Sequence, residues 1–350
     1  MSKITYLLGA GASANALPVV KNIPQKLALF RNFIHDDRSG LNDILDAGKS
    51  IRELEDDFLH ECDEIIDLLN KKFHASIDTY AKRLRLPSPH TQSALKKYKR
   101  LKGILSTFFI HEQLNNPVDY RYDSFLASIL GDSHTDFPKN LNILTWNYDF
   151  QFEKAYSTYS GKSSISENQS ELMVFESGRY WMDIGNFGIF KLNGTTNTYK
   201  IKDGRPNLNY LLDDFIPKPN KEQVEKYIRL YNNILYKDSG VRSSLSFAWE
   251  SDWENETRNF IEKTLMSIRN TEILVVIGYS FPFFNRGLDK KIFQSFGDSL
   301  KRIYIQDTNS DAVAESVESI LPDLTPISRS SKVQIIQKSS VEQFFLPPEL

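Results

Sequence analysis

The stretch Ile-Thr-Tyr-Leu-Leu-Gly-Ala-Gly-Ala-Ser, residues Ile4–Ser13, carries the clearest fold signal in the chain. Its first half is a short apolar run, which is typical of a strand buried on both faces of a parallel sheet. Its second half is a turn of small residues, where a backbone can approach a pyrophosphate and offer its amide groups as donors. The third glycine of the common dinucleotide fingerprint is absent, and a tight strand-to-helix turn also suits small residues. The candidate phosphate-binding residues in this turn are Gly9, Ala10, Gly11 and Ser13.

Further apolar runs of the same kind recur along the chain, with helical periodicity between several of them. They are short, rich in Ile, Val and Leu, and followed by polar turn residues. The runs are Leu141–Thr145, Gly188–Leu192, Ile273–Ile277, Ile303–Gln306 and Val333–Ile336. The alternation predicts an α/β, Rossmann-like fold with a mainly parallel sheet of about six strands and helices on both faces.

A long segment after the first strand breaks this alternation. Apolar residues there recur at three- and four-residue spacings, which indicates amphipathic helices. We therefore predict a Rossmann-like core formed by residues 1–38 and 137–350, and a helical insertion subdomain over residues 39–136. The polar stretch Ser160–Ser170 is predicted to be a loop.

Composition bears on the class of protein. Among 350 residues, 43 basic and 45 acidic side chains nearly cancel, unlike the basic excess of a dedicated nucleic-acid binder. No apolar run approaches the roughly 20 residues that span a bilayer, and the first apolar stretch is too short for a signal peptide. The single cysteine, Cys62, excludes an internal disulfide and a four-cysteine zinc module. We expect a cytoplasmic protein with no metal and no membrane contact.

The densest basic cluster spans Lys96–Lys102. Charge runs of this kind usually form a solvated helix face. The alternative is a contact with nucleic acid or with an acidic partner.

Polar residues also follow the other predicted strands directly. Open α/β sheets bind ligands at the carboxyl ends of their strands, so these side chains are expected to face one crevice. A helix cap or an ordinary turn explains each of them singly. These candidates are Asn147 and Asp149, Asn193, Gly278 and Ser280, and Asp307. Arg286 lies just beyond the Gly278 turn, where it either reaches a ligand phosphate or forms a surface ion pair.

Taken together and in order, five motifs resemble those of sirtuin-like domains, in particular the bacterial sirtuin-like NAD hydrolases of antiphage defence. They are Gly-Ala-Gly-Ala-Ser (9–13), Thr-Trp-Asn-Tyr-Asp (145–149), Lys-Leu-Asn-Gly (191–194), Gly-Tyr-Ser-Phe (278–281) and Ile-Gln-Asp (305–307). The resemblance covers roughly residues 1–35 and 138–340, but not the helical insertion.

The resemblance implies that NAD is the ligand and assigns one set of residues to its adenosine diphosphate half. The turn at residues 9–13 would hold the pyrophosphate. Gly278 and Ser280 would contact phosphate or ribose, and Asp307 would lie near the adenosine ribose.

The resemblance also implies a nicotinamide pocket lined by Asn147 and Asp149. Asn147 would orient a water molecule or a ribose hydroxyl while the bond between nicotinamide and ribose breaks. The transition state of that reaction is oxocarbenium-like, so the protein mainly positions groups and stabilises developing charge.

One position departs from the family. Relatives usually carry a histidine in the motif that reads Lys-Leu-Asn-Gly here, and Asn193 occupies its place. An asparagine cannot accept a proton as a base near neutral pH. Three explanations stay open: an engineered inactivating substitution, a natural enzyme relying on Asn147 and a positioned water, or a pseudoenzyme. Protein deacetylation is disfavoured, since it usually needs both the histidine and a zinc module.

The function expected from this resemblance is hydrolysis of NAD to nicotinamide and ADP-ribose in bacterial antiphage defence. Such an effector must be silent until it is triggered, either by homo-oligomeric assembly or by a separate sensor protein. The alternative is a catalytically silent module that binds NAD or a related nucleotide and signals to a partner. A third hypothesis is a scaffold that contacts nucleic acid through Lys96–Lys102. The motifs leave open whether ADP-ribose is hydrolysed, cyclised or transferred.

Overall fold

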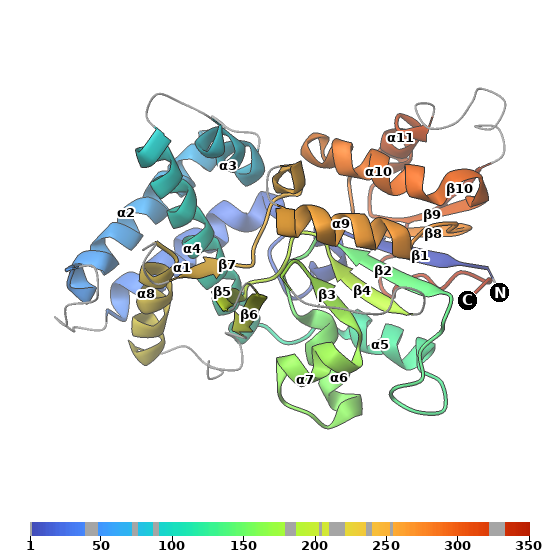
Figure 1. The fold of residues 1–350 in the computed structure, drawn as a ribbon, viewed down its shortest axis with the longest axis horizontal. Helices are drawn as coiled ribbons and strands as arrows, with labels where there is room; N and C mark the ends of the chain where they lie inside the picture. The colour runs from blue at the N-terminus through green and yellow to red at the C-terminus, as the bar shows by residue number, and fades with distance from the viewer. Residues whose placement is uncertain are drawn as a thin grey trace. The chain divides into compact units, whose positions relative to one another are not determined.

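The computed structural model comprises two compact units. It describes residues 2–38, 48–71, 76–86, 91–178, 187–202, 205–209, 221–235, 240–252, 255–321 and 333–350. Unit 1 consists of Met1–Asn15, Val118–Thr195 and Ser246–Leu350, and unit 2 of Ala16–Pro117 and Thr196–Leu245. Unit 1 contains the predicted sheet, whereas unit 2 is mostly helical (Figure 1).

Within its described residues, unit 1 contains a seven-stranded sheet in which every neighbouring pair is parallel. The strand order is β10-β9-β8-β1-β2-β4-β3. The strands are β1 (Ile4–Leu8), β2 (Leu141–Thr145), β3 (Val174–Glu176), β4 (Gly188–Lys191), β8 (Ile273–Ile277), β9 (Arg302–Gln306) and β10 (Gln334–Lys338). The Rossmann-like α/β prediction is confirmed, with seven strands rather than about six. The strand that was not predicted, β3, has only three residues, too few for a recognisable apolar run.

Apolar side chains fill the space on both faces of this sheet. One core cluster contains Leu7, Leu144 and Val276, and the other contains Tyr6, Ile143 and Val275. Helices α9 (Asn255–Ser267), α10 (Arg286–Phe296) and α11 (Ser310–Glu318) cover the first face; α5 (Tyr120–Ile129) and α6 (Gln151–Ser160) cover the second (Figure 1). This double burial explains why the strands are nearly continuous apolar runs.

The predicted loop Ser160–Ser170 is wrong in its second half, because the structure forms helix α7 (Ile165–Glu171) there. Ser164 caps this helix by accepting a hydrogen bond from the backbone nitrogen of Glu167. Ser-x-x-Glu is a known helix-start signal, so the sequence did contain the information.

The strand order creates a switch point beside β1. From β1 the chain continues to β2 and β4 on one side, and it later enters β8 on the opposite side of β1. Open α/β sheets bind their ligands at such a switch point, outside the carboxyl ends of the strands. The turns that follow β1 and β8 therefore occupy the expected position for a ligand site.

Unit 2 combines helices with a small antiparallel sheet of order β6-β5-β7 in its described residues. The helices are α1 (Ile23–Asp36), α2 (Ile51–Asn70), α3 (Ile77–Arg85), α4 (Thr91–Asn115) and α8 (Lys221–Leu235), and the strands are β5 (Thr198–Lys202), β6 (Arg205–Asn209) and β7 (Val241–Ser243). Its core includes the ring of Phe30 from α1, in contact with Phe58 from α2 and Tyr227 from α8.

The two units have different boundaries from the predicted core (1–38 and 137–350) and insertion (39–136). Helix α1 precedes residue 39 but belongs to unit 2, because its apolar face packs on α2. Helix α5 lies within 39–136 but belongs to unit 1, because Tyr122 and Phe125 enter the core of the parallel sheet. Residues 196–245 join unit 2 from far along the chain.

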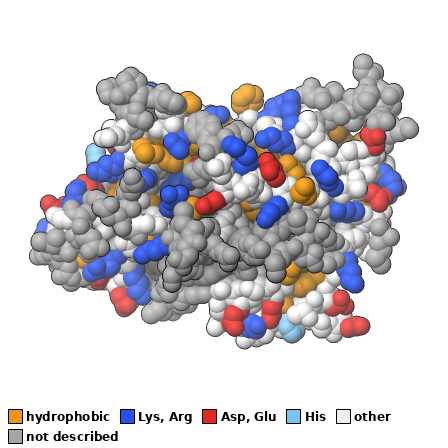
Figure 2. Space-filling model, viewed as in Figure 1, with side chains coloured by type: hydrophobic (Ala, Val, Ile, Leu, Met, Phe, Trp, Pro, Cys, Tyr) orange, Lys and Arg blue, Asp and Glu red, His pale blue; other side chains and the backbone are white. Residues whose placement is uncertain are grey.

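The basic cluster Lys96–Lys102 lies on α4, where acidic side chains of α2 neutralise part of it. Lys97 pairs with Glu64 at 2.9 Å, and Arg100 pairs with Glu61. Basic and acidic side chains lie among one another on the face drawn in Figure 2. In the part of the chain that the structure describes, no helix is long and apolar enough to cross a membrane.

Candidate functional site

The turns after β1 and β8 are packed directly against each other. The backbone nitrogen of Gly11 donates to the carbonyl oxygen of Gly278 at 3.0 Å, and Gly9 donates to Ile277 at 3.0 Å. A Cβ atom on Gly278 would lie 2.5 Å from backbone atoms of Gly11 and Ala12, and Gly278 has a φ of +60°. A Cβ atom on Gly9 would lie 2.6 Å from the backbone carbonyl oxygen of Gly278. These glycines are therefore required by backbone packing, whatever ligand they meet.

Ser13 joins the β1 turn to the end of β2 through a buried hydrogen-bond network. Its hydroxyl donates to Oδ2 of Asp149 at 2.7 Å and accepts from Nδ2 of Asn147 at 3.0 Å. Since that hydroxyl has one hydrogen, the hydroxyl of Tyr122, 2.7 Å away, is the donor in their contact. Asn147 also donates to the carbonyl oxygen of Gly9 at 3.0 Å. Four predicted site residues, Gly9, Ser13, Asn147 and Asp149, thus form one connected cluster.

Helix α5 contributes a second buried contact to the same turn, which the sequence analysis missed. Nη2 of Arg121 donates to the carbonyl oxygens of Gly11 at 3.2 Å and Ala12 at 2.9 Å. Asp119 holds the guanidinium, at 3.0 Å from Nε and 2.6 Å from Nη2. Asp119 also caps α5 by accepting from the backbone nitrogen of Arg121. An Asp cap two residues after Pro117 was the available signal for this helix start.

A buried ion pair lies behind Asp149. Nζ of Lys191 donates to the backbone carbonyl oxygen of Asp149 and lies 3.2 Å from Oε2 of Glu153. Both side chains are essentially inaccessible to solvent, and Gln169 donates to the other oxygen of Glu153 at 3.0 Å. Burying two charges is costly unless they are paired and hydrogen-bonded, as here. The pair anchors the start of α6 to the end of β4.

Asn193 is buried next to the end of β2. The side-chain Nδ2 of Asn193 donates to the backbone carbonyl oxygen of Trp146 at 3.3 Å. The backbone carbonyl oxygen of Asn193 accepts from the backbone nitrogen of Ser246 at 2.8 Å. Oδ1 of Asn193, Nε1 of Trp146 and Oγ of Ser246 are all buried without a hydrogen-bond partner.

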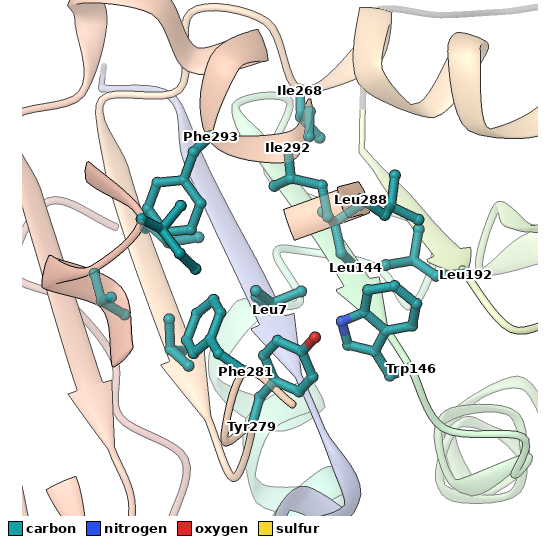
Figure 3. Packing of buried hydrophobic residues seen from close by; sticks show 14 of the residues in the cluster. Leu7, Leu144, Trp146, Leu192, Ile268, Tyr279, Phe281, Leu288, Ile292 and Phe293 are labelled. Carbon is teal, nitrogen blue, oxygen red and sulfur yellow. The ribbon is translucent and has the colours of Figure 1, made fainter. Parts of the chain in front are cut away.

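The residues after β8 form a turn held by another buried acid. The ring of Tyr279 stacks on Trp146, with centroids 5.7 Å apart (Figure 3), and its hydroxyl donates to Asp289 at 2.9 Å. Burial raises the pKa of Asp289 to about 8. Ser280 is exposed, and Phe281 has a φ of +52°, a left-handed conformation that is uncommon for a bulky residue.

The remaining predicted residues do not join the buried cluster. Ala10 is half-buried in the short 3-10 helix Ala10–Ser13. Arg286 begins α10 and donates to Oγ and the carbonyl oxygen of Ser319 at 3.1 and 2.9 Å. Asp307 follows β9 at the same edge of the sheet, half-buried, and accepts from the backbone nitrogen of Asn309 at 2.8 Å.

Within the residues that the structure describes, no three His, Cys, Asp or Glu side chains are grouped to hold a metal ion. The side chains of the Ser13–Asn147–Asp149 cluster supply one hydroxyl, one amide and one carboxylate. This set can bind a polyol or an amide by hydrogen bonds.

Neither a comparison with models of known protein families nor a search of curated proteins finds a match to this chain.

Proposed function

We propose that the carboxyl edge of the unit 1 sheet binds NAD, and that the chain hydrolyses it to nicotinamide and ADP-ribose. The observation that carries the proposal is the buried cluster Ser13–Asn147–Asp149, which is hydrogen-bonded to the glycine turn at the switch point of the sheet. This edge is where dinucleotides bind in open α/β folds. The five motifs that resemble sirtuin-like NAD hydrolases all lie on it.

The chemistry follows from the groups in the cluster. The bond between the ribose C1′ and the nicotinamide nitrogen breaks, water adds to C1′, and one proton is released. The carboxylate of Asp149 stabilises the positive charge that develops on the ribose, and it is the group here able to accept the proton of the water. The oxygen of Asn147 orients that water or a ribose hydroxyl. The Gly278–Ser280 turn and Asp307 hold the adenosine half.

An enzyme that consumes NAD must be controlled. We expect it to act in the cytoplasm in antiphage defence, and to become active on homo-oligomeric assembly or on contact with a separate sensor protein.

A second candidate function is a silent NAD-binding module. Asn193 supports it, because an amide in the place of the family histidine cannot accept a proton. In that case occupancy of the site, not turnover, would be the signal to a partner.

The deciding experiment incubates the purified chain with NAD and follows free nicotinamide, beside Asn193→His and Asn147→Asp. Turnover by the unchanged chain that Asn147→Asp abolishes supports the hydrolase. Turnover only in Asn193→His supports the silent module. If none of the three proteins binds NAD in calorimetry or turns it over, both candidate functions are overturned.

A further inference from the structure

We propose that the segment Ser340–Leu350, which follows β10, is a strap that holds the two glycine turns of unit 1 in their ligand-binding position. Release of the strap would then switch off the site at the carboxyl edge of the sheet. The inference concerns the regulation of that site, and it rests on the proposed function for the identity of the ligand. The contacts of the strap with Gln306 and Arg121 carry it.

The strap is fastened by side chains, since it forms neither a helix nor a strand of its own. Nε2 of Gln306 donates to the backbone carbonyl oxygens of Ser340 and Gln343, both at 2.6 Å. Oε1 of the same amide accepts from the backbone nitrogen of Phe345 at 2.9 Å. Gln306 itself is buried. One buried amide therefore makes three hydrogen bonds to the strap.

Gln306 connects the strap to the turn after β8. It is the last residue of β9, and its backbone carbonyl oxygen accepts from the backbone nitrogen of Gly278 at 3.0 Å. The carbonyl oxygen of Gly278 in turn accepts from the backbone nitrogen of Gly11. The residue that holds the strap by its side chain thus holds the β8 turn by its backbone, so a shift of the strap reaches Gly278 through one residue.

Arg121 connects the strap to the turn after β1. Nη1 of its guanidinium donates to the backbone carbonyl oxygen of Val341 at 3.2 Å. Nη2 holds the carbonyl oxygens of Gly11 and Ala12. Because a guanidinium is planar and its nitrogens form a rigid fork, it sets the spacing between the strap and the turn.

Phe344 fills the space between the strap and helix α5. Its ring packs edge-on against that of Tyr122, with centroids 5.0 Å apart, and its centroid lies 5.4 Å from the guanidinium carbon of Arg121. Tyr122 is the residue whose hydroxyl donates to Ser13. The strap therefore contacts both α5 side chains that reach the candidate site.

The strap detaches at a lower cost than the sheet beneath it. Within it, Phe344 and Pro347 are buried, whereas all five residues of β1 and of β8 are. Segments with few buried apolar contacts open locally at a lower free energy than core strands. Detachment breaks the bonds that Gln306 and Arg121 make to the strap and leaves both turns free to move. A ligand held by both turns binds the attached state, and by linkage its binding favours attachment.

The first test follows hydrogen exchange of the Phe345 amide by NMR in the full chain, with and without ADP-ribose. ADP-ribose carries the pyrophosphate and the adenosine that the two turns would hold, and the proposed hydrolysis does not consume it. At about ten times its Kd from calorimetry, it should slow exchange at Phe345 by about tenfold, because the amide exchanges from the detached state, which does not bind. Gly161, at the exposed end of α6, is the control, since its amide opens without moving either turn.

The second test repels the strap with one substitution. Gln306→Glu keeps the size of the side chain and the acceptor for Phe345, but it turns an oxygen toward carbonyl oxygens of the strap. It should weaken ADP-ribose binding by about tenfold, because losing about one hydrogen bond lowers the share of chains with the strap attached. Gln343→Glu makes the same change on an exposed side chain of the strap and should leave the affinity unchanged.

Phe344→Leu serves if Gln306→Glu does not fold. It keeps an apolar side chain but loses the ring contacts with Tyr122 and Arg121, and it should weaken ADP-ribose binding by about threefold to tenfold.

The exchange rate and the affinity separate the strap from the hydrolase. Exchange at Phe345 that is equal with and without bound ADP-ribose would overturn the proposal, as would equal affinities in the strap variants and the unchanged chain. The absence of ADP-ribose binding at millimolar concentration would overturn it as well. Slowed exchange at Phe345 without NAD turnover leaves the strap standing while the proposed hydrolase fails. NAD turnover with exchange at Phe345 that ignores the ligand does the reverse.

Discussion

The hydroxyl of Ser13 donates a 2.7 Å hydrogen bond to Asp149, a residue 136 positions further along the chain. The same oxygen accepts from Asn147. One small side chain in the β1 turn therefore fixes two polar side chains at the end of β2. This link makes the turn and the candidate catalytic residues a single structural element.

Ser13→Ala should lower the free energy of unfolding by about 1–3 kcal/mol, because it removes the buried hydrogen bonds that the Ser13 hydroxyl makes with Asp149 and Asn147. Urea unfolding measures this. Ser280→Ala changes the same residue type at an exposed position and should alter stability by less than about 0.5 kcal/mol. Equal stability losses in the two variants would contradict the network.

Gly278→Ala should lower the free energy of unfolding by more than about 2 kcal/mol. Its φ of +60° disfavours a side chain, and the added Cβ would meet backbone atoms of Gly11 at 2.5 Å. Gly287→Ala is the matched control, because a Cβ there meets nothing within 4 Å. That position lies in α10, where alanine is favoured by up to about 1 kcal/mol. A mild effect at Gly278 would show that the two turns are not tightly packed.

Arg121→Met should destabilise the chain by about 3–5 kcal/mol, because it leaves the carboxylate of Asp119 buried without its cation. Adding Asp119→Asn should recover part of this loss, since asparagine removes the charge and still caps α5. Chemical unfolding of the two single variants and of the double variant gives the coupling free energy between Arg121 and Asp119. Additive losses would mean that the two residues do not act as a pair.

The pH dependence of stability should contain a contribution from Asp289. Burial raises its pKa from an ordinary value of 3.8 to about 8, so the folded state favours the protonated form. This contribution is fully present below about pH 4 and is lost as the pH rises to about 8. Asp289→Asn keeps an acceptor for the Tyr279 hydroxyl but does not titrate. Between about pH 4 and pH 8, the free energy of unfolding of Asp289→Asn should rise relative to that of the unchanged chain. A difference that stays constant over this range would refute the raised pKa of Asp289.

The sheet was largely predictable because its central strands β1, β2 and β8 are buried along their whole length. The runs from Ile4 to Leu8 and from Ile273 to Ile277 match the observed strands residue for residue. The short strand β3 was missed, since three residues carry no periodicity. The helix after Ser164 was missed because its polar composition is typical of a loop, and only its capping residues indicate a helix start.

The candidate site was predictable only in its strand-end residues. Asn147 and Asp149 follow a strand directly, so their position at the carboxyl edge follows from the parallel sheet. Arg121 and Tyr122 reach the same site from a helix that the sequence pattern assigned to the insertion. No local pattern identifies such contacts, because the partners lie more than 100 positions apart.

The sequence by itself determined that unit 1 is a Rossmann-like parallel sheet with polar residues at the ends of its strands, since local apolar runs and turn residues encode those features. The tertiary structure alone decided the strand order, the pairing of the Gly11 and Gly278 turns, and the position of Arg121 behind them. It also decided that the atoms of Trp146 and Asn193 are buried without partners. The physical reason is that burial and hydrogen bonding between distant segments depend on packing of the whole unit, whereas strand formation depends on neighbouring residues.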